Sequence, residues 1–139
     1  MSGARPTPFT VELLDEVGYG RLSAARATEL FAAAFESRGL NLERAGEASV
    51  VLVEPETIRD LNHRFRGKDR ETDVLSFEVD GPYGEMAGEV VICPDCADMD
   101  IEELVVHGAL HLAGMDHGED FDGSEMARTQ RAVMDETRG

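Results

Sequence analysis

The chain has 139 residues, of which 42% are hydrophobic, and a formal net charge of −16 at pH 7. This length is typical of one domain with its own core, so we expect residues 1–139 to form a single domain. The acidic charge argues against indiscriminate nucleic-acid binding, because the mean field repels phosphate. No apolar run approaches the ~20 residues of a membrane span and the N-terminus lacks a signal-peptide core, so we expect a cytoplasmic protein without a membrane partner.

The first half of the chain predicts two strands, each followed by a helix. Alternating apolar residues over 9–13 indicate a short strand, and apolar residues at helical spacing predict a helix over residues 22–38. Residues 48–53 form a continuous apolar run, typical of a strand covered on both faces. Pro55 suits the first position of the next helix. We expect that helix to pack three apolar side chains, which are Ile58, Leu61 and Phe65.

A basic segment follows in this acidic chain. Residues 59–70 read RDLNHRFRGKDR and hold five of the 13 basic residues. We expect Gly67 to end the helix just after Arg66, which places the arginines at the mouth of a loop. A guanidinium there can hold a phosphate through two parallel hydrogen bonds, although composition alone fits a solvated helix face equally well. His63 is interpreted as a surface residue.

Two further strands are predicted in the second half. Apolar residues alternate with other residues over 72–79, which is typical of a strand with one buried face. The GPYG sequence at 81–84 is typical of a hairpin turn. Residues 88–93 form the next strand, which ends in the C-x-x-C pair of Cys93 and Cys96. A second cysteine pair is missing, so we expect these thiols to be dispensable for metal binding and activity.

Two helices complete the chain. The core face of the first is expected to comprise Ile101, Leu104, Val105, Ala109 and Leu112. Asp122 and Glu125 resemble a capping box at the start of a last amphipathic helix. Because strands and helices alternate irregularly, we predict an α+β fold: a small mixed β-sheet of about four strands packed with helices.

Residues 107–117 read HGALHLAGMDH and contain three of the four histidines. His107 and His111 are about one helical turn apart, so they project from the same side of a helix. Gly114 suits the end of that helix, after which the chain can turn back and bring His117 to the other two. Three neutral imidazoles with one open position are the ligand set of a catalytic zinc, whose bound water becomes a nucleophile near neutral pH. The pattern therefore predicts one Zn²⁺ per chain at a helix C-terminus.

The residue after the first histidine separates this motif from that of a protease. The three histidines have the spacing of the metzincin proteases, in which a glutamate in that position acts as the general base. Here the position holds Gly108. Peptide hydrolysis is therefore disfavoured.

Three sequence blocks resemble the YbeY family of bacterial endoribonucleases and rRNA maturation factors. They are LNHRFRGKDRETDVLSF, GEVVIC and HGALHLAGMDH, and the resemblance spans about residues 50–137. By this resemblance His107, His111 and His117 match the zinc ligands, and Arg66 matches the active-site arginine. The resemblance implies a metal-dependent hydrolase that cleaves single-stranded RNA. It also implies a role in 16S rRNA maturation and ribosome quality control, with the ribosomal subunit or assembly proteins as candidate partners.

On this basis Arg66 is expected to anchor the scissile phosphate beside the metal, and Arg66 and His107 receive catalytic roles. Candidate RNA contacts are Arg64, Lys68 and Arg70. Asp116 is a candidate partner for a ligand imidazole. Water and the RNA 2′-hydroxyl both remain candidate nucleophiles. Two alternatives stay open: a zinc hydrolase of a peptide or small ester, and a non-catalytic ribosome-assembly factor with a structural metal.

Overall fold

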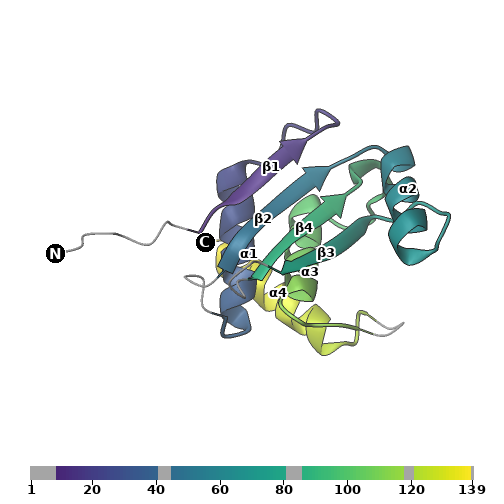
Figure 1. Cartoon of the computed structure of the whole chain (residues 1–139). Coiled ribbons are helices and arrows are strands. Elements are labelled where there is room, and N and C mark those ends of the chain that lie inside the picture. Colours follow the sequence, from purple (N-terminus) through teal and green to yellow (C-terminus); the bar gives the residue numbers. More distant parts are fainter. Residues whose placement is uncertain (1–8, 41–44, 81–85, 118–120, 139) are drawn as a thin grey trace.

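The computed structural model describes residues 9–40, 45–80, 86–117 and 121–138. Within these ranges four strands form one mixed sheet in the order β1-β2-β4-β3 (Figure 1). The strands β1 (Val11–Asp15), β2 (Ala45–Leu52) and β4 (Met86–Ile92) run parallel, whereas β3 (Val74–Asp80) runs antiparallel to β4. β3 therefore forms one edge of the sheet. The predicted α+β fold with a small mixed sheet is confirmed.

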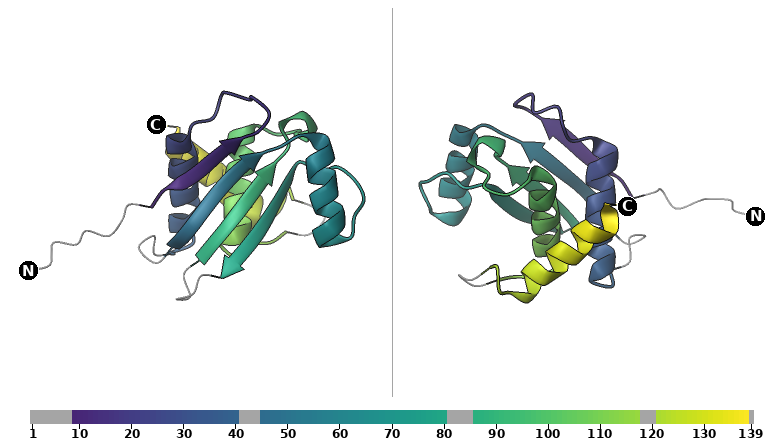
Figure 2. Two further views of the ribbon diagram at one scale, coloured as in Figure 1. Left: turned by 45° about the horizontal axis from the view of Figure 1, so that its top comes forward. Right: turned by 180° about the vertical axis from the view of Figure 1, so that it is seen from behind.

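The described helices cover the two faces of the sheet unequally. α1 (Ala24–Ser37), α3 (Ile101–Leu112) and α4 (Glu125–Thr137) lie together on one face, which the right-hand view of Figure 2 shows from behind. α2 (Pro55–Arg66) lies on the β3 side of the sheet (Figure 1), and a short 3-10 helix, η2 (Pro94–Cys96), follows β4. Among the residues described, no helix is both long enough and apolar enough to span a bilayer.

The alternation of side chains along β2 divides the core in two. Val50 and Leu52 are fully buried in the large cluster with α1, α3 and α4. Val51 and Val53 point the other way, into a smaller cluster with Ile58 of α2. The prediction of a strand covered on both faces is therefore confirmed, and the second face is the one that positions α2.

α3 lies against the sheet at a glycine. A Cβ atom added to Gly108 would lie 2.5 Å from Cγ1 of Val90 and 3.2 Å from Oγ of Ser76. Oγ of Ser76 also donates a hydrogen bond to the carbonyl of Gly108, at 3.2 Å. The absence of a side chain thus lets α3 approach β4 and β3 closely, and this approach carries His107 and His111 to the edge of the sheet.

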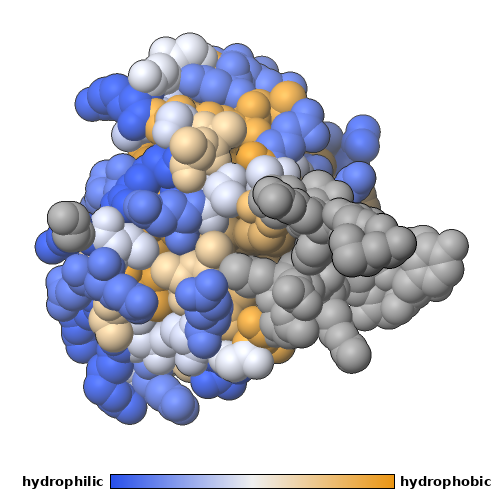
Figure 3. Space-filling model, turned by 90° about the vertical axis from the view of Figure 1, so that its left-hand side faces the viewer, coloured by the Kyte–Doolittle hydropathy of each residue, from blue (hydrophilic) through white to orange (hydrophobic). Residues whose placement is uncertain are grey.

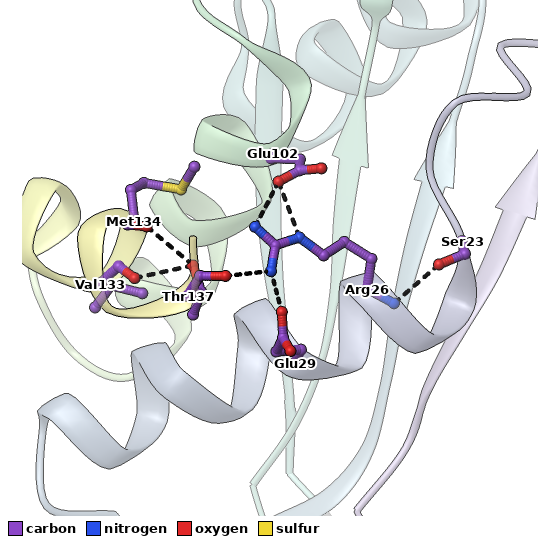
Figure 4. A network of polar contacts seen from close by, with 7 residues as sticks. All are labelled: Ser23, Arg26, Glu29, Glu102, Val133, Met134 and Thr137. Atoms are coloured by element: carbon purple, nitrogen blue, oxygen red, sulfur yellow. Dashed lines mark hydrogen bonds and ion pairs between the residues drawn. The ribbon is translucent and has the colours of Figure 1, made fainter. Parts of the chain in front are cut away.

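One arginine joins the three helices on that face. Arg26 of α1 donates to Oε1 of Glu102 in α3 at 2.9 and 2.8 Å, and to the carbonyl of Thr137 in α4 at 2.9 Å (Figure 4). It also pairs with Glu29. Because Arg26 is partly buried, these bonds help to fix the end of α4 against α1 and α3. Elsewhere hydrophilic side chains cover much of the surface, as the face in Figure 3 shows.

Two sequence predictions about the helices are wrong. Phe65 does not pack into the core: its side chain is 63% exposed, because the last turn of α2 extends beyond the small cluster around Ile58. Asp122 does not cap the last helix. Ser124 does so instead, since its Oγ accepts a hydrogen bond from the backbone N–H of Ala127 at 3.1 Å. The turn predicted at 81–84 lies outside the described residues.

Candidate metal centre

The end of α3 brings the three histidines together. Gly114 has a φ of 94°, which favours glycine, and its N–H donates to the carbonyl of His111 at 3.0 Å. The N–H of Met115 donates to the carbonyl of Leu110 at 2.9 Å. These two bonds form a Schellman motif, which ends the helix and reverses the chain. His117 then lies beside the other two histidines, as the spacing predicted.

The three imidazoles form a compact donor set. One ring nitrogen from each of His107, His111 and His117 lies within 4.8 Å of the others. The ring centroids are separated by 4.8, 5.2 and 5.4 Å. Nε2 of His107 and Nε2 of His111 face each other at 3.2 Å. Three imidazole nitrogens at such distances suit a single cation between them.

Hydrogen bonds determine which nitrogen of each helical histidine carries the proton. Nδ1 of His107 lies 3.0 Å from Oε1 of Gln130, and Nδ1 of His111 lies 3.0 Å from the carbonyl oxygen of Met115. Both oxygens can only accept, so each Nδ1–H must donate. The Nε2 atom of each ring therefore presents its lone pair to the other. This is the tautomer that binds a metal through Nε2.

The protonation state supports the same conclusion. Burial lowers the pKa of His107 to about 4, and burial also lowers the pKa of His111 below its ordinary value. Both rings are therefore neutral at pH 7, and two lone pairs facing at 3.2 Å repel unless a cation lies between them. In a tetrahedral site with bonds of about 2.0–2.1 Å, two nitrogens lie roughly 3.3–3.4 Å apart. The donor set thus fits a small divalent metal such as zinc.

The histidines line a cavity of about 850 Å³. Its other walls include Arg66, Asp73, Ser76, Phe77, Glu78, Asp116 and Phe121. Phe121 packs against two of the histidines, with ring centroids 4.9 Å from His107 and 5.0 Å from His117. The three-histidine group thus opens on one side to a cavity with both polar and apolar walls, which is large enough for a substrate.

Arg66 reaches this cavity from the opposite face of the sheet. It is the last residue of α2, where Gly67 ends the helix with a φ of 70°, as predicted. Its Nη2 donates to the carbonyl of Ser76 at 2.8 Å. Since β3 is an edge strand, the guanidinium can pass along its free side while the histidines of α3 lie on the other face. The cavity therefore extends across the edge of β3, between α2 and α3.

The other predicted site residues lie at varying distances from this centre. Arg64 pairs with Asp60 at 3.1 Å, and among the described cavity walls none is formed by Arg64, Lys68 or Arg70. Their role as RNA contacts stays a prediction. His63 is exposed and does not belong to the histidine group, as expected.

Asp116 lines the cavity, and its Oδ1 accepts a hydrogen bond from the backbone N–H of His117 at 2.8 Å. Its predicted contact with a ligand imidazole remains untested. Cys93 and Cys96 are free thiols. Burial raises the pKa of Cys96 to about 12, so it is a poor nucleophile, and neither cysteine joins the histidine group.

Sequence reasoning missed Gln130. It is 5% exposed, in α4, and holds the ring of His107. A signal was present, because Gln130 lies on the apolar stripe formed by Met126, Val133 and Met134. A lone polar residue on a buried helix face requires a partner.

The fold and the site together define an α+β protein with a three-histidine centre able to hold a metal ion. A family model described as endoribonuclease YbeY matches residues 19–138. The chain belongs to the endoribonuclease YbeY family, which is a family of nucleases.

Individual relatives agree with this membership. The endoribonuclease YbeY of Rubrobacter xylanophilus is 68% identical over 133 residues, which cover 95% of this chain and 98% of the relative. That of Thermotoga maritima is 37% identical over 103 residues, covering 66% and 67%. A protein of Thermotoga maritima with a known solution structure matches with a TM-score of 0.54 and 29% identity, covering 91% of this chain and 87% of that one.

Proposed function

We propose that the protein is a zinc-dependent endoribonuclease that cleaves single-stranded RNA. One observation carries the proposal: Arg66 from α2 and the three histidines around the end of α3 line the same cavity. A cation site beside a guanidinium suits a phosphodiester, because both groups stabilise negative charge on phosphate oxygens. Family membership supports RNA as the substrate.

In this proposal His107, His111 and His117 hold the metal. A bound zinc supplies Lewis-acid chemistry and lowers the pKa of a water molecule to about 7. Gln130 keeps His107 oriented, and the carbonyl of Met115 does the same for His111. Both water and the 2′-hydroxyl of RNA are nucleophiles compatible with this arrangement.

Arg66 binds the scissile phosphate. Its bond to the carbonyl of Ser76 uses one N–H donor and anchors the side chain over β3. The remaining donors of the guanidinium fork can take two phosphate oxygens. As charge grows on these oxygens in the transition state, the contacts strengthen, so Arg66 contributes mainly to the rate of the chemical step.

The biological setting follows from the resemblance of the three sequence blocks. We extend the proposal to cytoplasmic maturation of 16S rRNA and ribosome quality control. Ribosomal subunits or assembly proteins are the partners expected in that setting. The net charge of −16 supports selective rather than general RNA binding.

Two features weigh against the alternative functions. A structural zinc usually has four protein ligands, whereas among the described residues no fourth His, Cys, Asp or Glu joins His107, His111 and His117. A zinc protease of this spacing needs a glutamate after the first histidine. Here Gly108 packs too closely against Val90 to admit one.

Substitution of Arg66 tests the proposal. We expect Arg66→Ala to slow cleavage of a single-stranded RNA by about a hundredfold, the effect of losing roughly 3 kcal/mol of transition-state stabilisation. Arg66→Lys should recover part of the rate, since it restores the charge but not the planar fork. Zinc content and melting temperature serve as controls and should stay near wild type. Wild-type rates in Arg66→Ala would refute the phosphate role.

A further inference from the structure

Phe65 is the most exposed large hydrophobic side chain in the part of the chain that the structure describes. It is 63% exposed, compared with 44% for Leu14 on β1. A single exposed apolar side chain is common on a protein surface, so the significance of Phe65 depends on the residues next to it. Phe65 precedes Arg66 directly, at the end of α2.

The ring of Phe65 is held in place by a second aromatic residue. Its centroid lies 5.4 Å from that of Phe77 on β3, and the two ring planes make an angle of 69°. This edge-to-face arrangement is a favourable one for aromatic pairs. Phe77 itself lines the cavity, and the guanidinium carbon of Arg66 lies 5.9 Å from its ring centroid. Phe65, Phe77 and Arg66 therefore form one continuous surface, which we call the aromatic rim.

Charge alone provides little attraction for RNA near this rim. Two of the five basic side chains in residues 59–70 are already paired: Arg59 with Asp69 at 2.9 Å and Arg64 with Asp60 at 3.1 Å. Acidic side chains also line the cavity, namely Asp73, Glu78 and Asp116. These carboxylates repel phosphate, so an attraction that does not depend on charge would add to the affinity for RNA.

Resting on the proposed function, we propose that the aromatic rim is a base-stacking platform: an unpaired base next to the phosphate held by Arg66 stacks on Phe65. Aromatic side chains bind single-stranded nucleic acid in this way, because every base has a π-face. In a duplex the bases are already stacked on one another and their faces are covered. The platform thus selects single strands. It tolerates different bases, because stacking contacts the face of a base and does not depend on the hydrogen-bonding groups at its edge.

Three variants of the zinc-loaded enzyme test the platform in steady-state cleavage of an unstructured RNA. Phe65→Leu keeps an apolar side chain but removes the aromatic face, and should raise KM roughly fivefold or more with a much smaller change in kcat. Phe65→Tyr keeps the aromatic face, so its KM should lie closer to that of wild type than the KM of Phe65→Leu does. Leu14→Ala, on a distant exposed side chain, is the matched control and should behave as wild type. An unchanged KM in Phe65→Leu would overturn the proposal.

A competition experiment separates stacking from a general loss of binding. The same RNA strand, with and without abasic sites, is added as an unlabelled competitor. Wild type should prefer the strand that carries bases, and Phe65→Leu should lose most of this preference. A full preference in Phe65→Leu would also overturn the platform.

The two proposals fail in different ways. If the zinc-loaded wild type cleaves no RNA, the proposed function fails. The platform is then judged from the fluorescence anisotropy of a labelled strand. Base-dependent binding that is lost in Phe65→Leu would support it, and binding that does not depend on Phe65 would overturn it.

Discussion

At the scale of single residues, the orientation of His107 depends on Gln130. The Nδ1–H of His107 donates to Oε1 of Gln130 at 3.0 Å. The Nε2–H of Gln130 in turn donates to Sδ of Met99 at 3.6 Å. The second bond fixes the orientation of the amide, so that the oxygen faces His107. Gln130 therefore keeps the proton on Nδ1 and leaves Nε2 of His107 available to the metal.

We expect Gln130→Met to weaken zinc binding by about 10- to 100-fold, because methionine keeps the volume but cannot accept the Nδ1–H bond. Competition with a zinc chelator measures the affinity. Arg131→Ala, on the exposed neighbouring residue, is the control and should bind zinc as wild type does. Equal affinities in Gln130→Met and Arg131→Ala would show that this hydrogen bond does not orient the ligand.

The sequence predicted the three histidines but not the atoms that orient them. The spacing of His107, His111 and His117 follows helix geometry and glycine chemistry, which act over short distances along the chain. Gln130 comes from a different helix, and nothing in the spacing relates it to His107. Such contacts depend on the packing of α4 against α3, which local patterns do not determine.

At the scale of an element, the position of α3 depends on Gly108. The added methyl group in Gly108→Ala would meet Val90, whose side chain is short and fully buried. Overpacking costs about 1–3 kcal/mol, and the higher helix propensity of alanine returns at most ~1 kcal/mol. Taking the middle of the range for the cost, we expect a net loss of roughly 1–2 kcal/mol in the free energy of unfolding, measured by urea denaturation.

Glu103→Ala, in the same helix but half-exposed, is the matched control for Gly108→Ala. It should stay within about 0.5 kcal/mol of wild type. A Gly108→Ala protein as stable as wild type would mean that α3 can move away from the sheet without cost.

The turn after β1 provides a test by pH. The carboxylate of Asp15 accepts hydrogen bonds from the backbone N–H groups of Gly20, Tyr19 and Val17 at 2.8, 3.0 and 3.2 Å. These bonds, of which that to Gly20 is the strongest, hold the pKa of Asp15 below its ordinary value of 3.8. The folded state thus favours the ionised form. Its stabilising effect is present above the unfolded pKa and is lost as the pH falls through the folded pKa.

Asp15→Asn should therefore have a lower melting temperature than wild type at pH 7, because an amide nitrogen cannot accept the hydrogen bond from the backbone N–H of Gly20. The difference in melting temperature should shrink as the pH falls below about 4. Glu16→Gln removes the same charge from the next residue and is the control. A difference that persists unchanged in acid would contradict this role of the carboxylate.

The elements were predicted better than the positions of particular side chains within them. The strand at 48–53 is predictable because a short, continuous apolar run is typical of a strand buried on both faces. The helical spacing of Phe65 with Ile58 and Leu61 predicts a core position for its ring. Periodicity gives the face of a helix but not where the sheet beneath it ends, and the last turn of α2 extends beyond that limit.

At the scale of the whole molecule, the site depends on the topology of the sheet. β3 forms the edge, so residues of α2 and α3 can line one cavity although the two helices lie against opposite faces. The sequence contains 40 residues between Arg66 and His107, and no local pattern relates the two. Only the resemblance of the three sequence blocks to the YbeY family predicts that Arg66 lies near the histidines. The structure supplies the physical reason, which is the free side of an edge strand.

The central claim is that one metal ion at the three histidines enables the cleavage of RNA. The measurement that tests it most directly is cleavage of a single-stranded RNA by protein of known zinc content, before chelation, after chelation and after zinc is restored. His63→Ala is the matched control for His111→Ala, because His63 is exposed and lies outside the histidine group. We predict about one zinc per chain, loss of cleavage on chelation, and recovery with zinc in wild type and His63→Ala but not in His111→Ala. Undiminished cleavage by chelated protein, or by His111→Ala, would contradict the claim.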